Sequence, residues 1–254
     1  MKYTLLVPYE LNNKKAPFDN ANIRKALNLS LDRNVITDKV LGQGQTPTYV
    51  FTPTYIEEGH LIQQPAYSKE PMAQRNEEAI KLLEEAGYSK ANPLKFTILY
   101  NTNENHKKVA IAAASMWKAN TKGLIDVKLE NQEWKTYIDS RRAGRYDAAR
   151  AGWNADYNQA TTFGNYFLSN SSNNTAKYAN PEYDKAIAES YVATDAEGRA
   201  KAYAKAEEIL AKDFGIVPIF NYVNPRLVKP YVKGYSGKDP QDHIYLRNLY
   251  IIKH

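Results

Sequence analysis

Stretches with the two-residue alternation of β-strands take turns with stretches of helical periodicity along most of this 254-residue chain. Strand patterns cover the first dozen residues and the ranges 94–99, 125–129, 146–150, 216–222 and 226–229. Helical patterns cover 23–31, 35–41, 77–86, 106–118, 133–142, 181–191 and 195–212. Strands that alternate with helices form a sheet covered by helices, so the pattern predicts an α/β fold with a mixed or parallel sheet.

Capping residues and glycines mark several of the expected helix ends. Asp19 and Asn20 offer side-chain caps before the first helical stretch, and Gly42 follows the second. Residues 43–71 show little periodicity and are rich in Gln, Thr, Pro, Tyr and Gly, so we expect a long irregular excursion. The sequence has no internal repeat and no low-complexity linker, so no break into independent domains is expected.

Composition excludes several classes of protein. The chain has no cysteine, which excludes disulfides and thiol chemistry. It carries a formal net charge of +6, but Lys and Arg are interleaved with Asp and Glu, so we expect no nucleic-acid partner. No apolar run approaches the ~18 residues of a membrane span. The apolar part of the N-terminus is too short for a signal peptide, so no export signal is expected within this sequence.

The run from Tyr146 to Tyr157 combines a strand with an unusual set of side chains. Arg150, Gly152, Trp153 and Asp156 put a cation, a glycine, an indole and a carboxylate within seven residues. Alternation would place Arg150, Gly152, Asn154 and Asp156 on one side and Trp153 on the other. Small neighbours leave the backbone open to another extended chain, which could dock by strand addition. The alternative is an ordinary sheet strand with an incidental Arg and Asp.

The same run resembles the signature of the periplasmic oligopeptide-binding proteins that serve ABC importers. Arg-Ala-Gly-Trp-x-Ala-Asp-Tyr carries the resemblance, and other segments agree in the same order. These segments are Pro8–Asn13, Arg75–Glu78, Leu83–Tyr88, Leu99–Thr102, His106–Lys108, Asn131–Thr136 and Leu227–Pro230. The similarity runs from near residue 3 to His254 and therefore covers nearly the whole chain.

The resemblance implies an architecture and a set of partners. It implies a periplasmic-binding-protein-like lobe (type II, cluster C), with a mixed sheet flanked by helices. Residues 10–222 would form the peptide-binding C-terminal lobe of a two-lobed clamp. Residues 1–9 and 223–254 would be crossover strands and a tail that pack on a first lobe outside this sequence, so we expect them to be less well packed here. Short peptides, an ABC importer permease and that first lobe would be the partners, in the periplasm.

The resemblance also assigns ligand-binding roles to charged residues of this chain. Asp156 would pair with the α-ammonium of a bound peptide, and the alternative is a turn or cap aspartate. Arg150 and His106 would meet the peptide carboxylate, each for a different peptide length. The alternatives are a structural ion pair for Arg150 and a solvated helix-start residue for His106. Arg suits a carboxylate because its donors form a two-pronged fork.

Backbone and pocket positions follow from the same resemblance. Gly152 and Asn154 would lend main-chain groups to the ligand, although the family often has cysteine where Asn154 stands. Trp153 and Trp134 would line side-chain pockets, with core packing as the alternative. The remaining candidate pocket residues, for which a structural role is equally reasonable, are Glu10, Arg141, Tyr222, Tyr9 and Arg142. Trp117, on the apolar stripe of an Ala-rich helix, is assigned to the core.

These observations predict a peptide receptor and no enzyme. The sequence lacks a phosphate loop, a Gly-x-Ser-x-Gly elbow and a His-Glu-x-x-His motif, and its four histidines show no metal spacing. No cofactor is expected. One alternative keeps the fold and changes the ligand to a murein-type peptide or glutathione. A second is a protein-interaction domain that binds no small ligand. A hydrolase that uses Asp156 is the least favoured.

Overall fold

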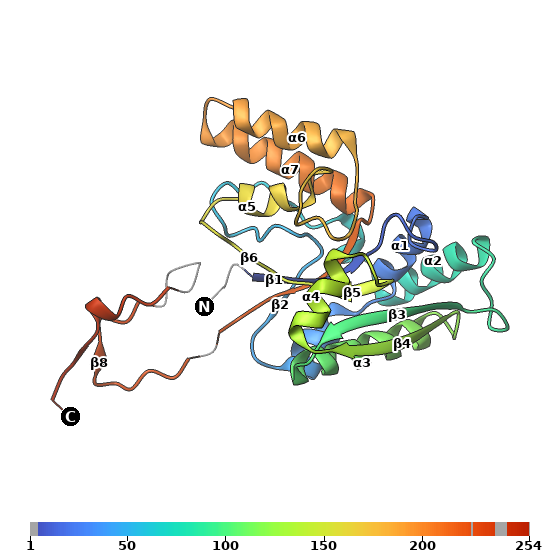
Figure 1. Ribbon diagram of the computed structural model, residues 1–254, viewed down its shortest axis with the longest axis horizontal. Helices are drawn as coiled ribbons and strands as arrows, with labels where there is room; N and C mark the ends of the chain where they lie inside the picture. The colour runs from blue at the N-terminus through green and yellow to red at the C-terminus, as the bar shows by residue number, and fades with distance from the viewer. Residues whose placement is uncertain (1–4, 225, 237–242, 254) are drawn as a thin grey trace.

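A seven-stranded mixed sheet organises the computed structural model, which describes residues 5–224, 226–236 and 243–253 (Figure 1). The strand order is β2-β7-β1-β5-β3-β4, and β6 also pairs with β1. The strands are β1 (Leu5–Leu11), β2 (Thr46–Pro47), β3 (Leu94–Asn101), β4 (Ile125–Gln132), β5 (Ala148–Arg150), β6 (Trp153–Asn154) and β7 (Ile216–Asn221). The β3–β4 and β3–β5 pairs are parallel and β1 pairs antiparallel with its neighbours, so the predicted α/β class with a mixed sheet is confirmed.

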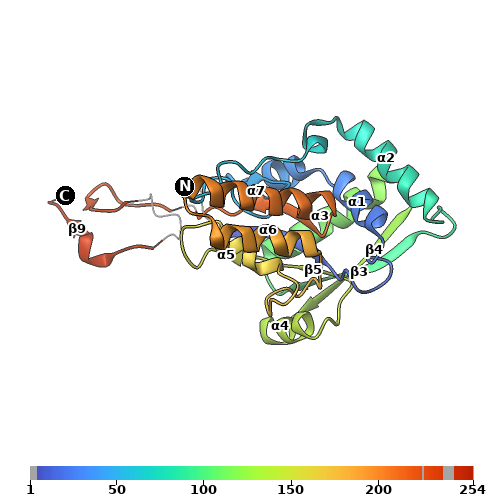
Figure 2. The same cartoon turned by 90° about the horizontal axis from the view of Figure 1, so that it is seen from above.

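Helices cover both faces of this sheet. One face carries α1 (Ala21–Leu29), α2 (Met72–Glu85) and α3 (Glu104–Asn120), together with a π-helix at Val35–Leu41. The other face carries α4 (Trp134–Arg142), α5 (Thr161–Gly164), α6 (Pro181–Val192) and α7 (Ala196–Lys212). Helices α6 and α7 lie side by side in both views (Figures 1 and 2). Short 3-10 turns lie at Ala66–Lys69, Asn165–Phe167 and Leu246–Asn248.

Local sequence explains most of the helix ends. Asn20 caps α1 by accepting a hydrogen bond from the Asn22 backbone at 2.9 Å, as predicted. Gly42, with φ +62°, ends the π-helix, and Gly87, with φ +89°, follows α2. The irregular excursion predicted over 43–71 is confirmed, apart from β2 and one 3-10 turn.

Side chains that alternate along the strands pack into separate clusters of the core. Val7, Tyr9 and Leu11 of β1 pack towards α1–α3, where Trp117 is fully buried as expected. Leu6 points to the opposite face, into the cluster beneath α5–α7. A third, smaller cluster joins β3 and β5 to α4. One sheet therefore supports buried clusters on both of its faces.

The N-terminal boundary differs from the expectation. Residues 1–4 lie outside the described part, but residues 6–9 are buried, and β1 is hydrogen-bonded to β5, β6 and β7 in the middle of the sheet. The position at residue 10 therefore lies inside a strand and does not coincide with a break in packing. The reason is that β1 contributes apolar side chains to clusters on both faces of the sheet, Val7 and Tyr9 to one and Leu6 to the other.

The C-terminal segment also differs in one respect. The strand expected over 226–229 does not form, and these four residues are exposed and irregular. Instead β8 (Val232–Lys233) pairs with β9 (Tyr250–Ile251) in a separate two-stranded sheet, away from the main sheet (Figure 1). Large apolar side chains are exposed along this tail, namely Leu227, Ile244, Tyr245, Leu246, Tyr250 and Ile251.

Candidate functional site

Three parallel strands end at the same edge of the sheet and bring the predicted charged residues there. β3 ends at Asn101, β4 at Gln132 and β5 at Arg150, and the neighbouring helices α3 and α4 begin at this edge. In open α/β sheets, the crevice beyond the carboxyl ends of strands is where ligands commonly bind. His106 lies in the first turns of α3, and Trp134 is the first residue of α4.

Arg150 and Gly152 lie together, as the alternation predicted. A side chain on Gly152 would place its Cβ 3.1 Å from Nη2 of Arg150 and 3.4 Å from the Leu6 carbonyl oxygen. Glycine therefore leaves room for the guanidinium to lie over the backbone. Arg150 pairs with Tyr9 across β5 and β1, so both side chains lie on the α3 face. The Tyr137 hydroxyl donates to the Arg150 carbonyl oxygen and holds the strand end against α4.

Some polar atoms at and near Arg150 lack a hydrogen-bond partner within the described residues. Burial lowers the pKa of the Arg150 guanidinium, whereas the nearby hydroxyls of Tyr137 and Tyr222 raise it. Within the described residues, Nε of Arg150 and the hydroxyl of Tyr9 are buried without a hydrogen-bond partner. Buried polar groups are normally paired, so these atoms are donors that a bound polar group could satisfy. Tyr222 therefore belongs to the same neighbourhood as Arg150.

His106 is held in a defined orientation beside this cluster. Its Nδ1 lies 2.9 Å from Oδ1 of Asn101, the last residue of β3. Asn103 caps α3 by accepting from the backbone N–H groups of Asn105 and His106. Burial, followed by the charge of Arg150, lowers the pKa of His106 from 6.5 to about 3. The imidazole is therefore neutral at ordinary pH.

Trp153 and Asp156, in the second half of the Tyr146–Tyr157 run, are both hydrogen-bonded to Thr162 of α5. The Thr162 hydroxyl donates to Oδ2 of Asp156 at 3.0 Å and accepts from the Asp156 backbone N–H at 3.1 Å. The Trp153 indole N–H donates to the Thr162 carbonyl oxygen at 2.9 Å. Asp156 and Asn154 are exposed, and Trp153 is half-buried against Tyr166, with ring centroids 4.9 Å apart. Sequence reasoning missed Thr162, because no motif or period links it to Trp153 and Asp156.

Trp134 presents a large exposed surface at the same edge. The residue is 54% exposed, and the centroids of its ring and that of Tyr137 are 5.7 Å apart. Glu133 caps α4 by accepting from the Lys135 backbone, so the tryptophan is fixed at the start of a capped helix. An exposed indole in this position is available as a wall of a side-chain pocket.

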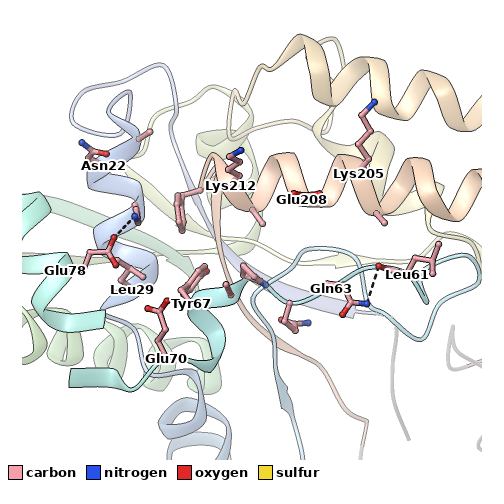
Figure 3. Close-up of a pocket in the computed structure, with 18 of the residues that line it drawn as sticks. Asn22, Leu29, Leu61, Gln63, Tyr67, Glu70, Glu78, Lys205, Glu208 and Lys212 are labelled. Carbon is pink, nitrogen blue, oxygen red and sulfur yellow. Dashed lines mark hydrogen bonds and ion pairs between the residues drawn. The ribbon is translucent and has the colours of Figure 1, made fainter. Parts of the chain in front are cut away.

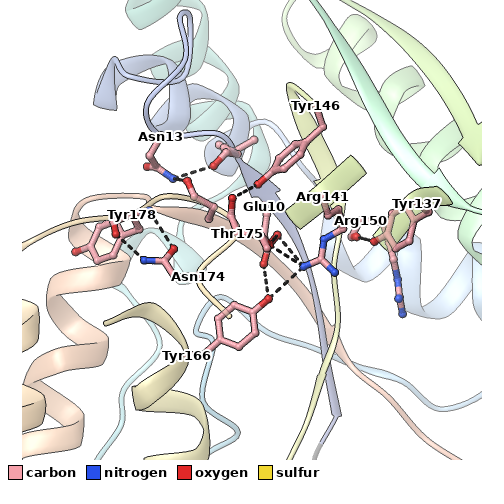
Figure 4. A network of polar contacts seen from close by, with 12 residues as sticks. Glu10, Asn13, Tyr137, Arg141, Tyr146, Arg150, Tyr166, Asn174, Thr175 and Tyr178 are labelled. Carbon is pink, nitrogen blue, oxygen red and sulfur yellow. Dashed lines mark hydrogen bonds and ion pairs between the residues drawn. The ribbon is translucent and has the colours of Figure 1, made fainter. Parts of the chain in front are cut away.

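Glu10 and Arg141 have a different environment from the other predicted residues (Figure 4). Glu10 is fully buried, and its Oε2 lies 2.8 Å from Nη2 of Arg141. The hydroxyls of Tyr166 and Thr175 also donate to the Glu10 carboxylate, at 2.6 and 2.5 Å. The Tyr146 hydroxyl closes the network by donating to the Thr175 carbonyl oxygen. These contacts favour a structural role for both residues, and a direct ligand-binding role for them stays a prediction.

A groove lies elsewhere, between α1, α7 and the 61–70 segment (Figure 3). Its volume is about 1020 Å³, and its lining includes the apolar side chains of Leu29, Tyr67 and Phe214. The walls mix lysines with glutamates, and Lys25 pairs with Glu78 at 2.5 Å. This mixture favours no single class of ligand, so we place the site at Arg150, where charge and unused donors coincide.

Neither a metal site nor a membrane-spanning helix is found in the described part of the chain. No group of three or more His, Cys, Asp or Glu residues is arranged there to hold a metal ion. Among the same residues, no helix combines the length and the apolar character that crossing a membrane requires.

Known proteins resemble this chain in sequence and in structure. The family model for bacterial extracellular solute-binding proteins, family 5 Middle, matches residues 2–175. The periplasmic oligopeptide-binding protein OppA of Haemophilus influenzae is 97% identical over 246 residues, which are 97% of this chain and 46% of that protein. The periplasmic murein peptide-binding protein MppA of Escherichia coli is 44% identical over 246 residues, which cover 97% of this chain and 45% of MppA.

A solved structure agrees with these matches. The crystal structure of Haemophilus influenzae OppA in complex with RPPGFSPFR has a TM-score of 0.94 and 94% sequence identity, and covers 99% of this chain and 49% of that one. The expected periplasmic-binding-protein-like fold is therefore confirmed. The chain spans about half the length of the curated relatives it matches. These relatives are solute-binding proteins and not enzymes. Together with the family match, they show that this chain belongs to the bacterial extracellular solute-binding proteins of family 5.

Proposed function

We propose that this chain is the ligand-binding C-terminal lobe of a periplasmic receptor that delivers short peptides to an ABC importer. In this proposal a second lobe, outside this sequence, closes over the peptide, and the permease receives it. The observation that carries the proposal is the half-buried Arg150 guanidinium, which lies over Gly152 and has an unused donor at the carboxyl edge of the sheet. The peptide bound by the similar OppA supports the same class of ligand.

The backbone around β6 offers a place for an extended peptide. Within the described residues, β6 pairs with β1 alone, whereas β5 pairs with both β1 and β3. The edge of β6 on the β3 side therefore keeps N–H and C=O groups available for strand addition. Such pairing is indifferent to ligand side chains, which suits a receptor for many peptide sequences. Gly152 and Asn154 supply the backbone groups in this arrangement.

Charges at the two ends of this edge would fix the direction of the peptide. Asp156 follows β6, and Arg150 precedes it, with His106 beside Arg150. We propose that Asp156 meets the α-ammonium, and that Arg150 or His106 meets the carboxylate. The peptide would then run antiparallel to β6. A charged group paired inside a closed site discriminates strongly against ligands that lack the opposite charge.

The proposal is tested in a full-length protein that joins this lobe to its first lobe. Calorimetry with tri- and tetrapeptides should show that Asp156→Ala weakens binding by about 30-fold or more, because a buried charge loses its partner. Asp139→Ala, which removes an exposed carboxylate from α4, is the matched control and should bind like the parent. Peptides with an acetylated N-terminus should bind the parent weakly and lose little further affinity in the Asp156 variant. Equal binding of free and acetylated peptides would refute the ammonium role.

The alternatives predict other outcomes of the same experiment. The 44% identity to MppA is the observation behind the murein-type alternative, and a murein tripeptide that binds at least tenfold tighter than ordinary tripeptides would establish it. A protein-interaction domain would bind none of these ligands. The isolated lobe should bind peptides only weakly, with dissociation constants on the order of millimolar, since its end charges stay screened by water.

A further inference from the structure

The hydrogen bond between His106 and Asn101 decides which imidazole nitrogen carries the proton. Oδ1 of Asn101 lies 2.9 Å from Nδ1 of His106, and an amide oxygen can only accept. Nδ1 is therefore the donor, and in a neutral ring Nε2 keeps a lone pair. Asn101 is itself buried, with 7% of its surface exposed, so the acceptor is held in place by the end of β3.

The charges around His106 oppose a second proton on the ring. Arg150 of β5 is the cation that faces it, and Asn101 of β3 is neutral. On α3 itself, Glu104, Lys107 and Lys108 are exposed to solvent. The ring also lies in the first turn of α3, where the helix dipole is positive. Burial and Arg150 together keep the pKa of His106 far below its usual value.

A neutral imidazole with a lone pair on Nε2 does not attract a carboxylate, because both groups are acceptors. We propose that Asn101 is the positioning residue of the His106 subsite: it fixes the Nδ1–H tautomer, so that a ligand carboxylate binds at Nε2 only together with a proton taken from solvent. This inference rests on the proposed peptide-binding function. Peptides whose carboxylate meets Arg150 need no proton, because the guanidinium is already charged.

The two proposed carboxylate-binding residues, Arg150 and His106, therefore respond differently to pH. Binding at Arg150 is independent of pH near neutrality, whereas binding at His106 gains from acid. If one proton enters with each ligand, the affinity for the peptide falls by about tenfold for each unit of pH increase. Peptide length, which decides whether the carboxylate reaches Arg150 or His106, would then set the pH dependence of binding.

The tautomer can be measured on this chain without any ligand. Long-range nitrogen–proton NMR spectra should show His106 as the Nδ1–H tautomer, with no titration between pH 5 and 8. Asn101→Leu should abolish that signature, and Asn101→Asp should make His106 titrate within this range, because a carboxylate beside Nδ1 stabilises the imidazolium. Asn131→Leu, at an exposed amide of β4, is the control and should leave the spectrum unchanged. An Nε2–H tautomer in the parent, or an unchanged signature in Asn101→Leu, would overturn the inference.

Proton uptake is measured on the full-length protein with a series of peptides of increasing length. Calorimetry in two buffers of different ionisation enthalpy should show uptake approaching one proton for the lengths that reach His106. The same lengths with carboxamide ends should show none, and His106→Gln should remove the uptake. Tight binding without uptake at every length would overturn the proton-coupled step and leave the peptide-binding function intact. Failure of every peptide to bind at any pH would overturn both.

Discussion

Replacing Arg141 by methionine should destabilise the lobe substantially, because Arg141 is the partner of a buried carboxylate. Arg141 lies 2.8 Å from Glu10, which is fully buried, so the variant leaves a carboxylate inside the protein without its cation. Removing one partner of a buried ion pair typically costs 3–5 kcal/mol. Tyr166 and Thr175 still donate to Glu10 in the variant, so we expect the lower end, about 3 kcal/mol.

The neighbouring arginine supplies the control. Arg142 is exposed at the end of α4, so Arg142→Met should change the free energy of unfolding by less than about 0.5 kcal/mol. For a domain of this size, 3 kcal/mol corresponds to a fall in Tm of roughly 6–12 °C. Calorimetric melting and urea unfolding of both variants measure this difference. If the two variants melt within a degree or two of each other, the buried pair does not stabilise the fold as argued.

A double variant measures the interaction energy between Glu10 and Arg141. Glu10→Leu combined with Arg141→Met removes both charges, and it should cost less than the sum of the single changes by about 2 kcal/mol or more. Burial alone lowers the pKa of Arg141, but the Glu10 carboxylate, helped by the hydroxyls of Tyr137 and Tyr166, raises it well above its usual value. A raised pKa on a cation gives stability that is present below the usual value and is lost only above it. The contribution of Arg141 should therefore be constant from pH 6 to 9.

Three further changes test other parts of the structure. Gly152→Ala should weaken peptide binding by the full-length protein about tenfold or more, because its Cβ would lie 3.1 Å from the Arg150 guanidinium; calorimetry measures it. Burial raises the pKa of Glu207, so the parent should lose stability as the pH rises above the usual pKa of a carboxyl group. Urea unfolding at pH 5–8 should show this loss in the parent and not in Glu207→Gln. Trp117→Phe should cost about 2 kcal/mol in urea unfolding, because the buried indole donates to a carbonyl oxygen, whereas exposed Trp134→Phe should cost under about 0.5 kcal/mol.

Local patterns in the sequence were sufficient to predict most helices and strands. The cap at Asn20 and the glycine at 42 depend on neighbouring residues alone, so they could be recognised before the structure was known. The sheet order could not, because β1 pairs with β7 across some two hundred residues of chain. No local period encodes which strand lies next to which. For the same reason the central position of β1 was not predicted, and the boundary at residue 10 was set within it.

In the candidate site, too, local features could be predicted from the sequence and contacts between separate elements could not. Arg150, Gly152 and Asp156 were found because they lie in one short run. The acceptor for His106 is five residues away, at the end of a strand, and the structure was needed to bring Asn101 to it. Thr162 follows Asp156 by six residues and was missed, because a lone threonine carries no signal of a tie to a carboxylate. A family resemblance identifies residue types, but the protonation of His106 depends on burial and on Arg150.

The use of guanidinium donors distinguishes the buried Arg33 and Arg75 from the proposed ligand arginine, Arg150. Arg33 is completely buried and donates to four backbone carbonyl oxygens and the Asn28 amide oxygen, with its Nε bonded to Thr48 and Pro218. Arg75 likewise uses Nε, Nη1 and Nη2 within the protein. Nε of Arg150 is equally shielded from water but has no such partner in the described residues. Nε of Arg141 is also buried without a partner there, but Nη2 of Arg141 lies 2.8 Å from the buried Glu10 carboxylate, whereas Arg150 forms no ion pair within the described residues. Because an unpaired buried cation costs stability, a ligand anion explains the position of Arg150 next to a glycine better than the fold does.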